Sequence, residues 1–114
     1  MTGTDFIANR VRPQSGDTIV AYHVSQEQMA SYLSEGVNEI IIQHPEASYV
    51  SSITTPVTIN WDEADLVAEI PITDAFLTAL MQFMLMRIFG EDSEDELNRQ
   101  RSVQAQQDYE REML

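Results

Sequence analysis

The 114-residue chain contains no cysteine and no lysine. Without cysteine, neither a disulfide framework nor a thiolate metal site can form. The first ten residues lack the basic start and apolar core of a signal peptide, so we expect no export signal. The apolar stretch from Phe76 to Phe89 contains Gln82 and Arg87 and is shorter than the roughly 20 residues that span a bilayer. We therefore expect no membrane association.

Basic residues are scarce. The six bases are all arginine and face nineteen acids, so the formal net charge is −13. A surface of this kind repels phosphate, which argues against a protein that grips DNA by releasing counterions. The charge is compatible with an ordinary solvated surface, with a mimic of DNA, and with a wall along which DNA slides without sticking.

Motifs of known catalytic and metal sites are missing too. The chain has no glycine-rich phosphate loop, no nucleophile elbow and no metal-spaced histidine pair. His23 and His44 have no acid or nucleophile at a spacing typical of a triad or a zinc site, so we expect both to be ordinary surface or interface histidines. The acidic run from Glu91 to Glu96 is not part of a twelve-residue calcium loop with a central glycine and a terminal bidentate glutamate. We therefore expect no enzyme, no cofactor and no metal.

The first half of the chain divides into an arm and a helix. Residues 1–23 contain Gly3, Pro13 and Gly16, which predict an extended N-terminal arm. A capping box at Ser25 and Gln28 predicts the start of a helix that ends before Pro45. Its predicted apolar face is Met29, Tyr32, Leu33, Gly36, Val37, Ile40 and Ile41, and its predicted polar face is Glu27, Ser34, Glu35, Asn38 and Glu39.

The hydrophobic period changes after Pro45. Apolar residues at Val57, Ile59 and Trp61 alternate with polar ones, which is typical of a strand. We expect two or three short strands, with candidates at Tyr49–Ile53, Val57–Trp61 and Leu66–Ile70. A sheet this small is stable only if it packs against the helices or pairs with a neighbouring copy.

The last part predicts two helices of opposite character. A long helix begins near Pro71 and ends at Gly90, and between Ala75 and Phe89 it is apolar nearly all round, so it must be enclosed. A second capping box at Ser93 and Glu96 then opens a polar helix, Glu94 to Leu114, which cannot enclose its neighbour alone. The expected consequence is assembly with copies of itself or with a larger partner.

The predicted fold is therefore mainly α. It is a small bundle of three or more helices with a short two- or three-stranded β insertion and an extended N-terminal arm. The arm spans residues 1–23, and the helical domain spans 24–114 with the insertion at about 46–70. Within it, Trp61, Phe76, Phe83 and Arg87 are candidate core or interface residues. Trp61 suits a core anchor or an interface hot spot, and Arg87 suits an ion pair with the acids at 91–96.

The order of these elements resembles the head-to-tail adaptor (connector or neck) proteins of tailed bacteriophages. In that family a proline-led apolar helix ends in a basic residue, and an acidic Asp-Ser turn leads to a second helix with Asn, Arg and Tyr. The segment from Met29 to Pro45 is similar to the family's first helix, so the resemblance covers about residues 25–114. The matching residues are Pro71, Arg87, Asp92, Ser93, Asn98, Arg101 and Tyr109.

Two positions depart from the family pattern. The family often has Tyr-Arg-Ala where this chain has Met86, Arg87 and Ile88, and often alanine in place of Ser102. These differences affect packing more than role.

The resemblance implies a structural virion protein at the head-tail junction, made in the host cytoplasm. Such a protein forms a ring, usually twelve-fold, that docks under the portal protein and presents a platform to the tail tube or nozzle protein. Genomic DNA passes through it without specific binding. The implied portal-docking residues are Tyr109, Arg111, Met113 and Leu114, and the acids expected to face the channel are Glu91, Asp92, Glu94, Asp95 and Glu96.

Two other functions fit the sequence. The net charge is compatible with a small acidic inhibitor that mimics DNA and binds a host nuclease or nucleoid protein. A tail-fibre or capsid-completion protein would share the virion location and differ only in its partner.

Overall fold

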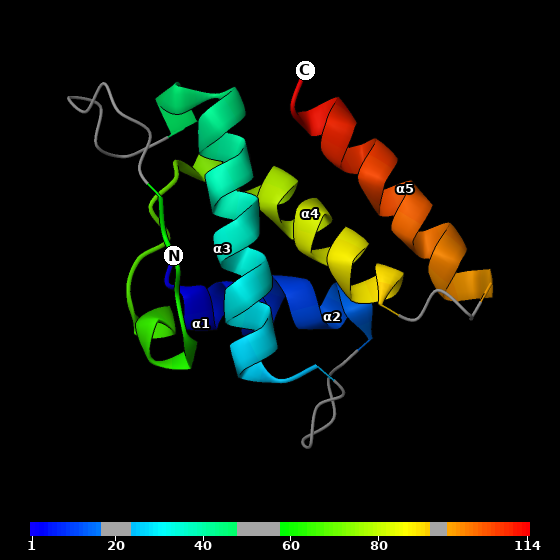
Figure 1. Cartoon of the computed structure of the whole chain (residues 1–114), viewed down its shortest axis with the longest axis horizontal. Helices are drawn as coiled ribbons and strands as arrows, with labels where there is room; N and C mark the ends of the chain where they lie inside the picture. The colour runs from blue at the N-terminus through cyan, green and yellow to red at the C-terminus, as the bar shows by residue number, and fades with distance from the viewer. Residues whose placement is uncertain (17–23, 48–57, 92–95) are drawn as a thin grey trace.

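The computed structural model describes residues 1–16, 24–47, 58–91 and 96–114, which form a mainly helical fold as predicted. Figure 1 shows α4 lying between α3 and α5, with the N-terminal helices running across the lower part of the view. The helices are α1 (Gly3–Phe6), η1 (Ile7–Val11), α2 (Arg12–Ser15), α3 (Gln26–Gln43), α4 (Leu77–Gly90) and α5 (Glu96–Glu112). Three short 3-10 helices join them: η2 (Pro45–Ala47), η3 (Glu63–Val67) and η4 (Asp74–Phe76).

The N-terminal segment is helical from residue 3 to residue 15, so the prediction of an extended arm is wrong there. Thr2 caps the helix, since its hydroxyl accepts a hydrogen bond from the Asp5 backbone N–H at 3.1 Å. Phe6, Ile7 and Val11 are completely buried. This burial stabilises the helix by removing apolar surface from water.

The start of this helix is fixed against a segment far along the chain. The backbone N–H of Gly3 donates to the Ala68 carbonyl at 3.1 Å, and Thr2 forms an isolated antiparallel bridge with Glu69. A side chain at Gly3 would place its Cβ only 2.9 Å from Leu66 Cδ2. Glycine is therefore required by the close approach of the two backbones.

The described part of the predicted β insertion, residues 58–70, contains no strand. The Asn38 side chain donates to the Ile59 carbonyl and accepts from its N–H, both at 2.8 Å, and the Trp61 N–H donates to Ser34 Oγ at 2.8 Å. Ser34 and Asn38 belong to α3, where we had placed them on the polar outer face. They supply the hydrogen bonds that a neighbouring strand would give, so the segment stays extended without a sheet.

The third strand candidate, Leu66–Ile70, is also wrong. Asp62 and Asp65 form a reciprocal capping box that begins η3 in this stretch, with bonds of 3.2 and 2.9 Å. Leu66 and Ile70 are still buried. The apolar pattern therefore predicted their burial correctly, but it predicted the wrong backbone conformation. The candidate at Tyr49–Ile53, like Val57, lies outside the described residues.

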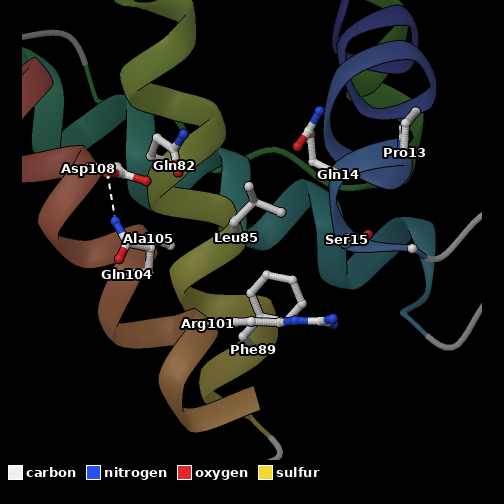
Figure 2. Close-up of a pocket in the computed structure, with 11 residues that line it drawn as sticks. Pro13, Gln14, Ser15, Gln82, Leu85, Phe89, Arg101, Gln104, Ala105 and Asp108 are labelled. Atoms are coloured by element: carbon white, nitrogen blue, oxygen red, sulfur yellow. Dashed lines mark hydrogen bonds between the residues drawn. The ribbon is translucent and has the colours of Figure 1, made fainter. Parts of the chain in front are cut away.

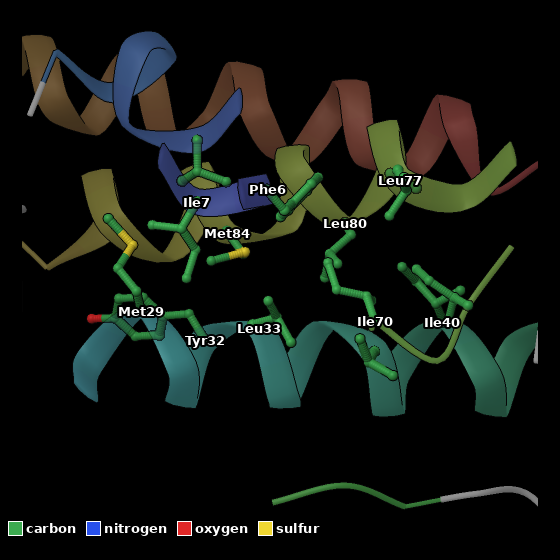
Figure 3. Packing of buried hydrophobic residues seen from close by; sticks show 14 of the residues in the cluster. Phe6, Ile7, Met29, Tyr32, Leu33, Ile40, Ile70, Leu77, Leu80 and Met84 are labelled. Atoms are coloured by element: carbon green, nitrogen blue, oxygen red, sulfur yellow. The ribbon is translucent and has the colours of Figure 1, made fainter. Parts of the chain in front are cut away.

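Helix α4 is partly enclosed within a single chain. Every residue of α4 is buried or half-buried except Arg87 and Gly90. α3 covers one side and α5 another, while η1 and α2 close a third. The supposed arm thus supplies one wall of this helix, while Phe83, Met86 and Phe89 stay half-buried in the single chain. Figure 3 shows Phe6 and Ile7 meeting side chains of α3 and α4 in the core.

Helix α3 begins as predicted, because Ser25 Oγ accepts from the Gln28 N–H at 3.1 Å. It crosses α4 at Gly36, where an added Cβ would lie 2.6 Å from Leu80 Cδ1 and 2.9 Å from Phe83 Cδ1. The absence of a side chain at residue 36 thus sets how closely α3 and α4 approach.

We predict that Gly36→Val lowers the free energy of unfolding by about 1–3 kcal/mol, because its side chain must push Leu80 and Phe83 out of place. Ser31→Val, at an exposed position of the same helix, is the matched control for the helix propensity of a β-branched residue. Urea unfolding followed by circular dichroism measures both. Equal stability of the two variants would contradict the tight crossing.

Candidate functional site

Most residues of helix α5 are exposed. It runs beside α4 in the opposite direction and packs chiefly on it (Figure 1). Ala105 and Tyr109 are the buried residues of α5, and Tyr109 packs edge-on against Phe83 at 5.5 Å between ring centroids. Ser102 Oγ donates to the Met86 carbonyl at 2.9 Å. Because α5 rests on one helix, a groove lies along each of its flanks.

The first groove, which we name the Tyr109 groove, lies between α3, α4 and the second half of α5. It has a volume of about 460 Å³. Its lining residues are Glu39, Gln43, Phe83, Met86, Gln106, Tyr109, Glu110, Met113 and Leu114.

Burial divides the four predicted portal-docking residues into two pairs. Tyr109 and Met113 are buried and belong to the core, whereas Leu114 is fully exposed. Arg111 is exposed and lies 3.7 Å from Asp108. Only Arg111 and Leu114 are therefore free to contact another protein without unfolding the end of α5.

The Tyr109 hydroxyl is buried and has no hydrogen-bond partner among the described residues. Burial raises the pKa of Tyr109 to about 12, with a smaller effect from the Glu39 carboxylate. A buried neutral hydroxyl without a hydrogen-bond partner lowers the free energy of unfolding of the isolated chain.

A histidine fastens the end of the chain to the end of α3. His44 Nε2 lies 2.7 Å from the Met113 carbonyl, and Nδ1 lies 2.9 Å from Glu46 Oε1. Both partners are acceptors, so only the doubly protonated ring can donate to both. The Met113 carbonyl, followed by Glu46, raises the pKa of His44 above its usual 6.5.

The second groove, which we name the Arg101 groove, lies on the opposite flank of α5 and faces α2. It has a volume of about 400 Å³. The Arg101 guanidinium lies over the Phe89 ring at 5.5 Å, as Figure 2 shows, and makes no ion pair among the described residues. The groove is lined by Pro13, Gln14, Ser15, Gly16, Gln82, Leu85, Phe89, Arg101, Gln104, Ala105 and Asp108.

The predicted channel-facing acids are partly described. Glu91 is exposed and accepts a hydrogen bond from the Gln28 side chain at 3.2 Å. Glu96 is exposed and pairs with Arg99 at 3.3 Å. The remaining three, Asp92, Glu94 and Asp95, lie outside the described residues.

Charge is unevenly distributed along the chain. No arginine occurs between residues 13 and 86, so α3, η3 and η4 carry acids without any lysine or arginine. Glu27, Asp62 and Glu63 surround a shallow hollow of about 560 Å³ in this region. In contrast, Arg99, Arg101 and Arg111 all lie on α5.

The four predicted core or interface residues take different roles. Trp61, Phe76 and Phe83 are half-buried and pack against the core cluster. Arg87 pairs with Glu35 of α3 at 3.3 Å and lies over the Tyr32 ring at 5.6 Å. Its partner among the described residues is thus an acid of α3, and the predicted pairing with the acids at 91–96 is not found for Glu91 or Glu96.

Sequence reasoning did not predict the contacts of His44 and Arg101 or the two grooves. The position of His44 just before the helix-ending Pro45 was visible, but its partner at Met113 depends on the tertiary fold. Thr2 and Asp5, at the spacing of a helix cap, were the available signal for the N-terminal helix.

In the described part of the chain, no group of three or more acidic, histidine or cysteine side chains is placed to hold a metal ion. None of the described helices has the length and apolar character to cross a membrane. No protein-family model, curated protein or solved structure matches the chain.

We predict that the stabilising contribution of His44 is complete below about pH 6.5 and is lost as the pH rises through its higher folded-state pKa. The difference in melting temperature between the wild type and His44→Gln should therefore shrink from about pH 6 to about pH 9. His23 is present in both proteins and cancels in this comparison. A difference in melting temperature that stays constant over this pH range would contradict the contact of a protonated His44 with Met113 and Glu46.

We also predict that Tyr109→Phe raises the free energy of unfolding of the isolated chain by about 1 kcal/mol, because it removes a buried hydroxyl without a partner. Tyr109→Ala, which also deletes the ring against Phe83, should cost about 3–5 kcal/mol. Chemical denaturation measures both values. A loss of stability in Tyr109→Phe would show that the hydroxyl is hydrogen-bonded.

Proposed function

We propose that this chain is a head-to-tail adaptor of a tailed bacteriophage. Copies assemble into a ring, twelve-fold by analogy with the family it resembles, which docks under the portal and presents a platform to the tail tube or nozzle. The order of helices, the acidic turn and the residues at Pro71, Arg87 and Tyr109 support this proposal.

The observation that carries the proposal is the position of α5. A polar helix that packs chiefly on one neighbour and has a groove along each flank is suited to contacts with further chains. The core of the protomer is already closed, so copies would meet as folded units. Cyclic assembly uses two different surfaces on each protomer, and the two flanks of α5 provide them.

The charge distribution supports passage of DNA. Acids at Glu91 and Glu96, together with Asp92, Glu94 and Asp95, would give the channel wall a negative face. The carboxylates of Glu27, Asp62 and Glu63 extend the surface that repels phosphate. DNA would then move through the ring with little adhesion.

For portal docking we propose Arg111 and Leu114 as the contact residues. Both are exposed at the end of α5, while Tyr109 and Met113 hold that end against the core. The hydrogen bond between His44 and the Met113 carbonyl positions the docking residues.

The acidic inhibitor remains the second candidate. The observation in its favour is the region from residue 13 to residue 86, which has acids but no lysine or arginine. It requires tight binding to a basic DNA-binding protein and competition by duplex DNA.

We predict that the purified chain adds a cyclic ring beneath portal rings of the same phage, as measured by light scattering and cryo-electron microscopy. Arg111→Glu combined with Leu114→Ser should weaken this binding at least about tenfold with an unchanged melting temperature. Val67→Ser, at a residue that is 78% exposed on η3, is the control and should bind normally.

A chain that stays monomeric and ignores the portal would overturn the adaptor function. If it then bound a basic DNA-binding protein and duplex DNA displaced it, the inhibitor would be the correct function.

A further inference from the structure

The two flanks of α5 carry opposite charge at their exposed edges. On one flank Arg101 is exposed, stacks on Phe89 and makes no ion pair among the described residues. Asp108 on the same flank accepts from Gln104 at 3.1 Å and lies near Arg111, so its charge is engaged locally. This leaves the guanidinium of Arg101 as the unpaired charge of this flank.

The Tyr109 groove on the other flank has two acids and no base among its lining residues. Glu39 accepts only from Gln43, and Glu110 accepts only from Gln106, so neither carboxylate has a cationic partner among the described residues. These carboxylates complement a guanidinium in sign and in hydrogen-bonding geometry.

The apolar surfaces of the two flanks are complementary as well. Leu97 precedes Arg101 by one helical turn, so the two residues share a face, and Leu97 is 52% exposed. The Tyr109 groove offers Phe83 and Met86, both half-buried, as an apolar floor. Tyr109 contributes a buried hydroxyl that lacks a partner among the described residues.

We propose that the occupant of the Tyr109 groove is a second copy of this chain, which inserts the first half of its own α5. Leu97 of the second copy covers Phe83 and Met86, and its Arg101 pairs with Glu39 and Glu110. This inference rests on the proposed ring, since it names the surfaces through which the copies of the ring meet.

The contact is heterologous, because each copy uses one flank of α5 as donor and the other as acceptor. Such contacts repeat and close into a ring when the rotation between copies allows it. Stacking on Phe89 holds the Arg101 guanidinium in place before association, which lowers the entropic cost of pairing.

The first test is charge reversal across the contact. Arg101→Glu and Glu110→Arg should each weaken self-association at least about tenfold, as measured by analytical ultracentrifugation, since each variant opposes like charges. A mixture of the two should recover association, because both possible contacts in a mixed pair again join opposite charges at residues 101 and 110. Arg99→Glu is the matched control, since Arg99 already pairs with Glu96. Association of both single variants at the wild-type level would overturn the proposal.

Disulfide trapping provides the second test and detects contacts too weak for ultracentrifugation. The chain has no cysteine, so in an oxidised mixture of Leu97→Cys and Gln106→Cys proteins every disulfide joins introduced cysteines, and mass spectrometry distinguishes the mixed dimer from the two homodimers. We expect a mixed dimer from this pair, and none when Val67→Cys replaces Leu97→Cys. Equal cross-linking by Val67→Cys, or no cross-link in the presence and absence of portal rings, would overturn the proposal.

The two tests separate this inference from the proposed function. Rings on the portal with unchanged assembly of the charge variants would refute the α5 contact and leave the adaptor function in place. A specific Leu97 to Gln106 cross-link without any portal binding would support the contact and refute the adaptor.

Discussion

The enclosure of α4 is the constraint on which the rest of the structure depends. This helix has apolar side chains on almost every face, and burial of that surface is the main favourable term in a chain of this size. One neighbour cannot cover such a helix, so α3, α5 and the N-terminal helices pack around it. Gly3 and Gly36 allow the close approaches that this arrangement needs, at Leu66 and at Leu80. The polar character of α5 is tolerated because one stripe of it, Ser102, Ala105 and Tyr109, packs on α4.

Sequence reasoning predicted the helices and failed on the segments between them. Periodicity and capping residues placed α3 and the body of α4 well, since their signals are local and strong. The N-terminal helix was missed because Pro13 and Gly16 were taken as breakers, although Pro13 lies near its end and Gly16 terminates it with a positive φ of 80°. The alternation at Ile59 and Trp61 was real, but Ser34 and Asn38 replaced the neighbouring strand. Only tertiary contacts decide between these outcomes.

The candidate surfaces were harder to predict than the fold. The C-terminal residues were predicted as one docking group, and their division into buried and exposed members depends on how α5 lies on α4. The His44 contact joins residues 69 positions apart, and no local pattern encodes it. The bias of arginine to the two ends of the sequence was visible from the start. Its relevance to a contact between copies depends on the structure, which places Arg101 and Glu110 on opposite flanks of α5.

The single-sided packing of α5 has a consequence for the folding of the chain. Because its buried contacts are almost entirely to α4, α5 can detach as a cooperative unit while α1 to α4 keep their mutual contacts. Its amide hydrogens should then exchange through a partial opening of lower free energy than global unfolding. Detachment also exposes Leu85 and the half-buried Phe83 and Phe89. The opened form therefore presents apolar surface and is prone to aggregation. Any contact that covers the flanks of α5 therefore also protects the chain from aggregation through its own central helix.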